Sequence, residues 1–129
     1  MNYAIQINAS PYASPAGLVA YRFVQAALQA GHRIVQIFFY QEGIAHALRY
    51  ALPPDDELHL TAQWSALARD QGIDLLVCIS AAQRRGLLCL DEARRQGAGD
   101  DDLADGFRIG GLGQWLEATW QADRCLVFG

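Results

Sequence analysis

Short apolar runs alternate with segments of helical periodicity along this chain, and this alternation limits the fold more than any other feature. The apolar runs cover residues 3–7, 34–39, 73–78, 107–109 and 125–128. The second run is almost continuously apolar, which is typical of a strand that is covered on both faces. Strands that alternate with helices pair in parallel through right-handed crossovers. We therefore expect a three-layer α/β/α sandwich with a mainly parallel sheet of about five strands.

The segments between the apolar runs carry signals for helix starts and helix stops. Ser14–Pro15 has the form of an N-cap followed by proline at the first helical position, and Gly31 is placed to end that helix. Asp55 or Asp56 can cap a second helix, which Gly72 would end. These signals predict two helices between the first three strands.

A final helix and a final strand are predicted near the end of the sequence. Four residues recur on one face of that helix: Leu112, Trp115, Leu116 and Thr119. Cys125 lies in the final apolar run, and a free cysteine in such a strand behaves as a small hydrophobic residue. We expect Cys125 to be buried, and Cys89, which lies among leucines, to be buried as well.

Size and charge exclude several classes of protein. The 129 residues suffice for one domain with a core, so we expect a single domain over residues 1–129. No apolar stretch approaches the roughly 18 residues that cross a bilayer, and the N-terminal residues lack the basic region of a signal peptide; both points favour a cytoplasmic protein without membrane contact. The net charge is −4, and the arginines are scattered, whereas direct nucleic-acid binding usually needs a basic stripe. The acidic residues 100–102 and Asp105 are interpreted as a solvated loop or, alternatively, as a docking patch for a basic partner.

Metal and nucleotide motifs are not supported. The three cysteines and three histidines are dispersed and form no CxxC motif, so neither a zinc site nor a disulfide framework is expected. The glycines of 110–113 follow a late strand and lack the spacing of a dinucleotide-binding fingerprint. We interpret them as a tight strand-to-helix turn and predict no cofactor.

Cys78 is the residue best placed for chemistry. It closes the apolar run 73–78, and a short helix is predicted directly after it, with Ser80 and Gln83 at the spacing of a capping box and Gly86 as the stop. Open α/β sheets bind ligands at the carboxyl edge, and the start of a helix stabilises a thiolate. A buried cysteine that merely ends its strand is the alternative interpretation.

Tyr40 and Glu42 follow the second strand and therefore reach the same sheet edge as Cys78. They are candidates to line a thiol pocket. The alternative is that the Tyr-x-Glu-Gly segment forms only an ordered turn.

The whole chain resembles the DsrE-like sulfurtransferases, most closely the TusD/DsrE subunit. The resemblance rests on Phe38-Phe39-Tyr40 with Glu42-Gly43, on Val77-Cys78 followed by Ala81-Ala82-Gln83-Arg84-Arg85-Gly86, on Gly111-Leu112-Gly113 with Glu117-Ala118, and on Asp123-Arg124. The cysteine followed by Ala-Ala-x-Arg-Arg-Gly is the most specific of these segments. The chain departs from the family pattern at 87–90, where relatives often carry acidic or polar residues and this sequence has Leu-Leu-Cys-Leu.

The resemblance implies a five-stranded parallel sheet and a persulfide carried by Cys78, without a metal or an organic cofactor. Tyr40, Glu42, Ser80 and Arg84 are the candidate pocket-lining residues. The implied partners are an upstream persulfide donor, two sister subunits (TusB- and TusC-like) in a heterohexamer, and a TusE- or DsrC-like acceptor. The sulfur would end as 2-thiouridine at the wobble position of certain tRNAs. The alternatives are a DsrE-type subunit in dissimilatory sulfur oxidation and a non-catalytic structural subunit of the same hexamer.

Overall fold

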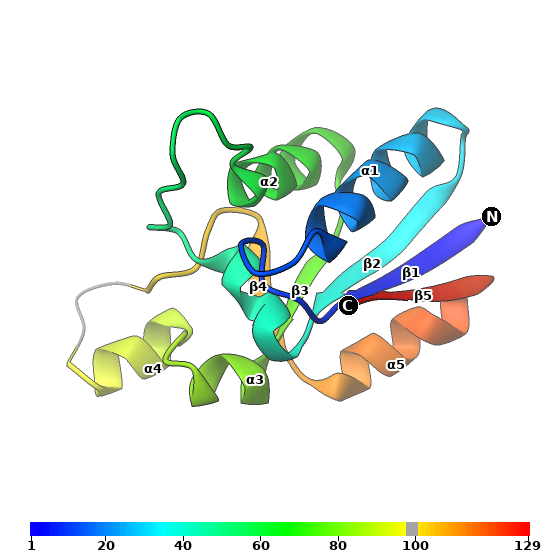
Figure 1. The fold of residues 1–129 in the computed structure, drawn as a ribbon. Helices are drawn as coiled ribbons and strands as arrows, with labels where there is room; N and C mark the ends of the chain where they lie inside the picture. The colour runs from blue at the N-terminus through cyan, green and yellow to red at the C-terminus, as the bar shows by residue number, and fades with distance from the viewer. Residues whose placement is uncertain (98–100) are drawn as a thin grey trace.

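The computed structural model describes residues 1–97 and 101–129, and its strands and helices alternate as the sequence predicts (Figure 1). The strands are β1 (Asn2–Ile7), β2 (Arg33–Phe39), β3 (Leu75–Cys78), β4 (Phe107–Gly110) and β5 (Arg124–Phe128). The helices are α1 (Ala16–Gln29), the 3-10 helix η1 (Gln41–Ala47), α2 (Leu60–Gln71), α3 (Ile79–Arg84), α4 (Leu90–Arg95) and α5 (Leu112–Gln121). Within these ranges, no helix combines the length and the apolar character that a membrane span requires.

The strands of the described residues form one five-stranded parallel sheet in the order β4-β3-β2-β1-β5. Helices cover both of its faces, with α1 and α2 on one side and α5 on the other (Figure 1). Successive side chains of β2 point to opposite faces. Phe39 packs against Trp64 of α2 with 5.7 Å between ring centroids, and Phe38 stacks on Trp115 of α5 at 5.1 Å. The expected three-layer α/β/α architecture is therefore confirmed.

A buried histidine ties η1 to two neighbouring elements. Nδ1 of His46 accepts a hydrogen bond from the indole of Trp64 (3.1 Å), and Nε2 lies 3.1 Å from the carbonyl oxygen of Ala9. Because an indole N–H can only donate and a carbonyl can only accept, the proton of the neutral ring belongs on Nε2. Burial lowers the pKa of His46 from 6.5 to about 4, against the opposing effect of the Ala9 hydrogen bond. A Cβ on Gly17 of α1 would collide with this ring, so α1 also packs closely on it.

The two long helices begin later than the sequence predicts. Ser14 does accept a hydrogen bond from the first helical amide (3.1 Å), but Pro15 occupies the N-cap position rather than the first helical position. Neither Asp55 nor Asp56 caps α2, because a turn at residues 55–57 separates them from the helix. The N-cap of α2 is instead His59.

Part of the predicted apolar face of α5 is exposed. Trp115 is buried and Thr119 is half-buried, but Leu112 and Leu116 are 52% and 57% exposed, and Trp120 is 86% exposed. The helix therefore presents one apolar side to the sheet and a second one outward. Of the face that the spacing indicates, the sheet covers Trp115 and leaves Leu112 and Leu116 exposed.

Two of the three cysteines are less buried than expected. Cys125 is exposed, because β5 is an edge strand of the sheet and its apolar run is covered incompletely. Cys89 is half-buried and serves as the N-cap of α4.

Part of the acidic segment is held by an arginine. Arg49 lies 3.3 Å from a carboxylate oxygen of Asp101 and 3.9 Å from one of Asp105. The interpretation as a fully solvated loop is thus wrong for Asp101, and Asp100 lies outside the described residues.

Candidate functional site

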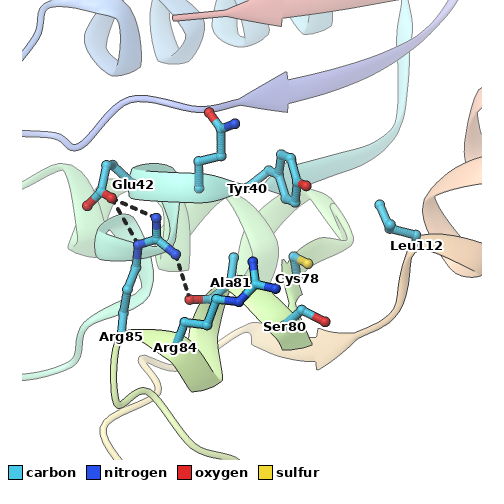
Figure 2. Close-up of a pocket in the computed structure, with 9 residues that line it drawn as sticks. Tyr40, Glu42, Cys78, Ser80, Ala81, Arg84, Arg85 and Leu112 are labelled. Atoms are coloured by element: carbon cyan, nitrogen blue, oxygen red, sulfur yellow. Dashed lines mark hydrogen bonds and ion pairs between the residues drawn. The ribbon is translucent and has the colours of Figure 1, made fainter.

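The carboxyl ends of β2, β3 and β4 meet at one edge of the sheet, and the residues that follow these strands enclose a pocket (Figure 2). Its volume is about 520 Å³. The lining residues are Tyr40, Gln41, Glu42, Cys78, Ser80, Ala81, Arg84, Arg85 and Leu112. The four pocket-lining candidates named from the sequence thus lie around the same pocket as Cys78.

Cys78 stands where β3 turns directly into α3. It is the last residue of the strand and the N-cap of the helix, with extended backbone angles (φ −63°, ψ 122°). Its side chain is only 2% exposed, yet it lines the pocket. In Figure 2 its sulfur lies between the side chains of Tyr40 and Ser80. A sulfur in this position is shielded from bulk water and is approached through the pocket.

The predicted capping box after Cys78 is wrong. α3 begins at Ile79, two residues earlier than a cap at Ser80 would require. Ser80 therefore lies within the first helical turn and contributes to the pocket wall. The predicted stop is confirmed, since Gly86 follows the helix with a φ of +80°.

Arg85 joins α3 to η1 at the mouth of the pocket. Its Nε and Nη2 atoms donate to the same carboxylate oxygen of Glu42 (3.1 and 2.7 Å), and Nη1 donates to the carbonyl oxygen of Ala81 (3.0 Å). The hydrogen bond from Arg85 holds the pKa of Glu42 below its usual value. The same hydrogen bond is the largest cause of the raised pKa of Arg85, and the charge of Cys78 is a smaller one. Because Glu42 is 68% exposed, the pair contributes little to stability, but it fixes the arginine's direction.

Arg84 is placed differently from its neighbour. Figure 2 shows its guanidinium extending toward Cys78, whereas that of Arg85 turns to Glu42. Arg84 is predicted from the sequence as a pocket residue, whereas Arg85, which also lines the pocket, is not. The adjacent arginines in the sequence indicate that one of them could reach Glu42, but they do not indicate which one.

The segment that leads from β2 into η1 is strained at the pocket wall. Gln41 has a φ of +51°, which non-glycine residues rarely adopt. The amide of Tyr40 donates to the carbonyl of Ile7 (3.0 Å), and the amide of Gly43 donates to the carbonyl of Tyr40 (2.8 Å). A Cβ on Gly43 would overlap the Ile7 carbonyl, so only glycine allows this approach. The segment is thus both an ordered turn and a wall of the pocket, and Gln41 is a lining residue that is not predicted from the sequence.

Leu112 forms the wall from the side of β4. A single residue, Gly111, connects β4 to α5, which confirms the interpretation of the glycines as a tight strand-to-helix turn. From the sequence, Leu112 is expected on one face of the final helix, and it is not among the pocket candidates. Its position directly after this turn was the signal that it reaches the carboxyl edge of the sheet.

Comparisons with known proteins give a consistent picture. The model of the DsrE/DsrF-like family matches residues 1–128. The protein named "Putative sulfurtransferase DsrE" of Allochromatium vinosum is 45% identical, with 100% of this chain and 99% of that protein covered. The sulfurtransferase TusD homolog of Pseudomonas aeruginosa is 43% identical over 100% of this chain and 98% of its own length. The sulfurtransferase TusD of Serratia proteamaculans is 39% identical over 99% of each chain.

A solved structure gives the same result for the fold. The crystal structure of the ychN protein of E. coli matches with a TM-score of 0.78 and covers 99% of each chain. At 22% sequence identity this similarity concerns the fold alone. The family model's match to residues 1–128 and the relatives at 45% and 43% identity show that the chain belongs to the DsrE/DsrF-like family.

Proposed function

We propose that the protein is a sulfurtransferase that carries sulfane sulfur as a persulfide on Cys78. The observation that carries the proposal is a shielded thiol that lines a pocket at the carboxyl edge of the sheet. Full-length relatives at 38–45% identity that are named sulfurtransferases support the same chemistry.

The transfer needs two displacement steps at sulfur. The Cys78 thiolate attacks the outer sulfur of a donor persulfide, so that a new S–S bond forms at Cys78 and the donor's S–S bond breaks. The donor leaves as a thiolate, and Cys78 then carries the sulfane sulfur. In the second step an acceptor thiolate attacks that outer sulfur and releases the Cys78 thiolate. No external oxidant or reductant enters either step, so neither a metal nor an organic cofactor is required.

The pocket walls suit a reactive sulfur intermediate. Tyr40 and Ser80 bring hydroxyl groups to the lining, and Leu112 adds an apolar wall. Shielding matters because exposed, ionised cysteine species are the ones that oxidise or exchange with other thiols. The arrangement would protect the persulfide between donor and acceptor.

The relay that we propose extends beyond this chain. Sister subunits similar to TusB and TusC would assemble with it into a heterohexamer, and a TusE- or DsrC-like protein would accept the sulfur for 2-thiouridine in tRNA. Leu116 and Trp120, one turn apart on α5, and Val127 of β5 are exposed apolar side chains. They support assembly, since apolar surface that gathers in patches marks interfaces. The net charge of −4 agrees with a cytoplasmic relay protein that does not itself hold tRNA.

A DsrE-type subunit in sulfur oxidation is the second candidate. It is favoured by the relative named DsrE, which is 45% identical to this chain, against 43% for the TusD homolog of Pseudomonas aeruginosa. The thiol chemistry at Cys78 would be the same, and only the final destination of the sulfur would differ.

Complementation tests the proposed function. Cys78→Ser should fold and assemble but fail to restore 2-thiouridine in a strain that lacks the gene, whereas Cys89→Ser and Cys125→Ser, as matched controls, should restore it. If Cys78→Ser restores normal tRNA thiolation, the relay role of Cys78 is wrong and the alternative of a structural subunit is favoured. If deletion of the gene stops sulfur oxidation and leaves tRNA thiolation intact, the second candidate replaces the first.

A further inference from the structure

Two adjacent arginines line the pocket, and their charges are used differently. The guanidinium of Arg85 donates to Glu42 and to the carbonyl oxygen of Ala81. Within the described residues, 1–97 and 101–129, Arg84 forms neither a hydrogen bond nor an ion pair. Its guanidinium nevertheless extends toward Cys78 (Figure 2). Among the described residues, the Arg84 guanidinium is thus a positive charge at the pocket without an ion-pair partner.

The charges that line the pocket do not cancel. Among the described lining residues, the charged ones are Glu42, Arg84 and Arg85. Glu42 and Arg85 compensate each other in a 2.7 Å ion pair, which leaves the positive charge of Arg84. The pocket therefore has a net positive charge before any ligand enters.

The sulfur of Cys78 needs such a charge when it reacts. At 2% exposure, a thiolate or a persulfide anion at this position loses most of its hydration. An anion that is removed from water is strongly disfavoured unless a cation or hydrogen-bond donors replace the water. Arg85 lies near enough for its charge to interact with that of Cys78, but it is paired with Glu42. Within the part of the chain that the structure describes, the lining arginine without such a partner is Arg84, whose side chain is exposed at the pocket.

We propose that Arg84 is the anion-pairing residue of this pocket: it holds the negative charge on the sulfur that reacts at Cys78, while Glu42 keeps Arg85 from that role. In the thiolate state the partner is the Cys78 sulfur, and after loading it is the outer sulfur of the ionised persulfide. The persulfide part of this inference rests on the proposed function. The pocket then favours small ligands with negative charge beside the reacting atom over neutral ligands of the same size.

Two alkylating reagents of similar size test the charge without requiring sulfur transfer. In a Cys89→Ser/Cys125→Ser background, Cys78 is the remaining thiol, and its rates with anionic iodoacetate and neutral iodoacetamide are compared. Both reagents attack the same thiolate, so the iodoacetamide rate reports how accessible and how ionised the sulfur is. The ratio of the two rates isolates the effect of the pocket's charge on an anionic ligand beside the sulfur. If the separation between the two charges is taken as about 6 Å, removing the positive one lowers such a ratio about three- to tenfold, for effective dielectric constants of about 80 and 40.

Four variants distinguish Arg84 from its neighbour. Arg84→Gln should lower the iodoacetate-to-iodoacetamide ratio about three- to tenfold, and Arg84→Lys should largely keep it. Glu42→Gln should raise the ratio, since it frees Arg85. The Glu42→Gln/Arg85→Gln double variant removes two opposite charges and should keep the parental ratio.

Two results would contradict the assignment of Arg84. A ratio that is unchanged in Arg84→Gln, or that falls only when Arg85 is replaced together with Glu42, overturns the assignment. Sulfane sulfur on Cys78 is measured separately by mass spectrometry. If Cys78 carries sulfur but the rate ratio does not change in Arg84→Gln, the inference about Arg84 is wrong and the proposed function is unaffected. If the ratio falls in Arg84→Gln but Cys78 carries no sulfur, the proposed function is wrong and the charge pairing by Arg84 is supported.

Discussion

Lowering the pH should destabilise this protein through one buried side chain, His46. The ring is fully buried and neutral, with both nitrogens hydrogen-bonded, and its pKa is lowered to about 4 by burial. In the unfolded chain the pKa returns to its ordinary value of about 6.5, so the unfolded state binds this proton first. The stability that the neutral ring provides is complete above about pH 6.5 and is lost as the pH falls toward 4.

The size of this effect follows from the two pKa values. Between pH 7 and pH 5 the loss attributable to His46 is about 2 kcal/mol, and it approaches about 3 kcal/mol at lower pH. Other groups titrate in the same range, so the informative quantity is the difference between the wild type and His46→Gln. The glutamine amide can also donate and accept hydrogen bonds, but it does not titrate.

Urea denaturation of both proteins at pH 7 and pH 5 measures this difference. The free energy of unfolding of the wild type should fall about 2 kcal/mol further than that of His46→Gln. Parallel losses in the two proteins would refute the reasoning, because they would mean that His46 is protonated in the folded state as readily as in the unfolded one.

Two further substitutions test the packing around the site and the exposed surface. Gly43→Ala should lower the free energy of unfolding by about 1–3 kcal/mol in chemical denaturation, because the alanine Cβ would overlap the Ile7 carbonyl. An unchanged free energy of unfolding would mean that η1 approaches β1 less closely. Trp120→Ser should change the stability of the isolated chain by less than about 0.5 kcal/mol, because the indole is 86% exposed, but it should weaken co-purification with the sister subunits. Intact co-purification would place the interface elsewhere.

The sequence predicted the fold well because the fold depends on features that are local and periodic. Alternating apolar runs located the five strands, and glycines with positive φ ended helices where expected, as at Gly31, Gly72 and Gly86. The exposure of Cys125 and Leu116 could not be predicted in the same way. Periodicity identifies an apolar side of a helix or strand, but how much of that side is covered depends on strand order and on partner chains.

The site was predictable only in part. The end of an apolar run located Cys78 at the carboxyl edge, and chain order brought Tyr40 and Glu42 to the same edge. The choice of Arg85 rather than Arg84 as the partner of Glu42 depends on where α3 begins. Each residue turns a helix by about 100°, so an error of two residues in the helix start changes which arginine faces η1.

The most direct test of the central claim is mass spectrometry of the intact protein after incubation with a persulfide donor, followed by peptide mapping. The account predicts one added sulfur atom on the peptide that contains Cys78, and its loss when an acceptor thiol is added. It also predicts an unloaded Cys78→Ser protein under the same conditions. Sulfur found on Cys89 or Cys125 while Cys78 stays unmodified would contradict the account.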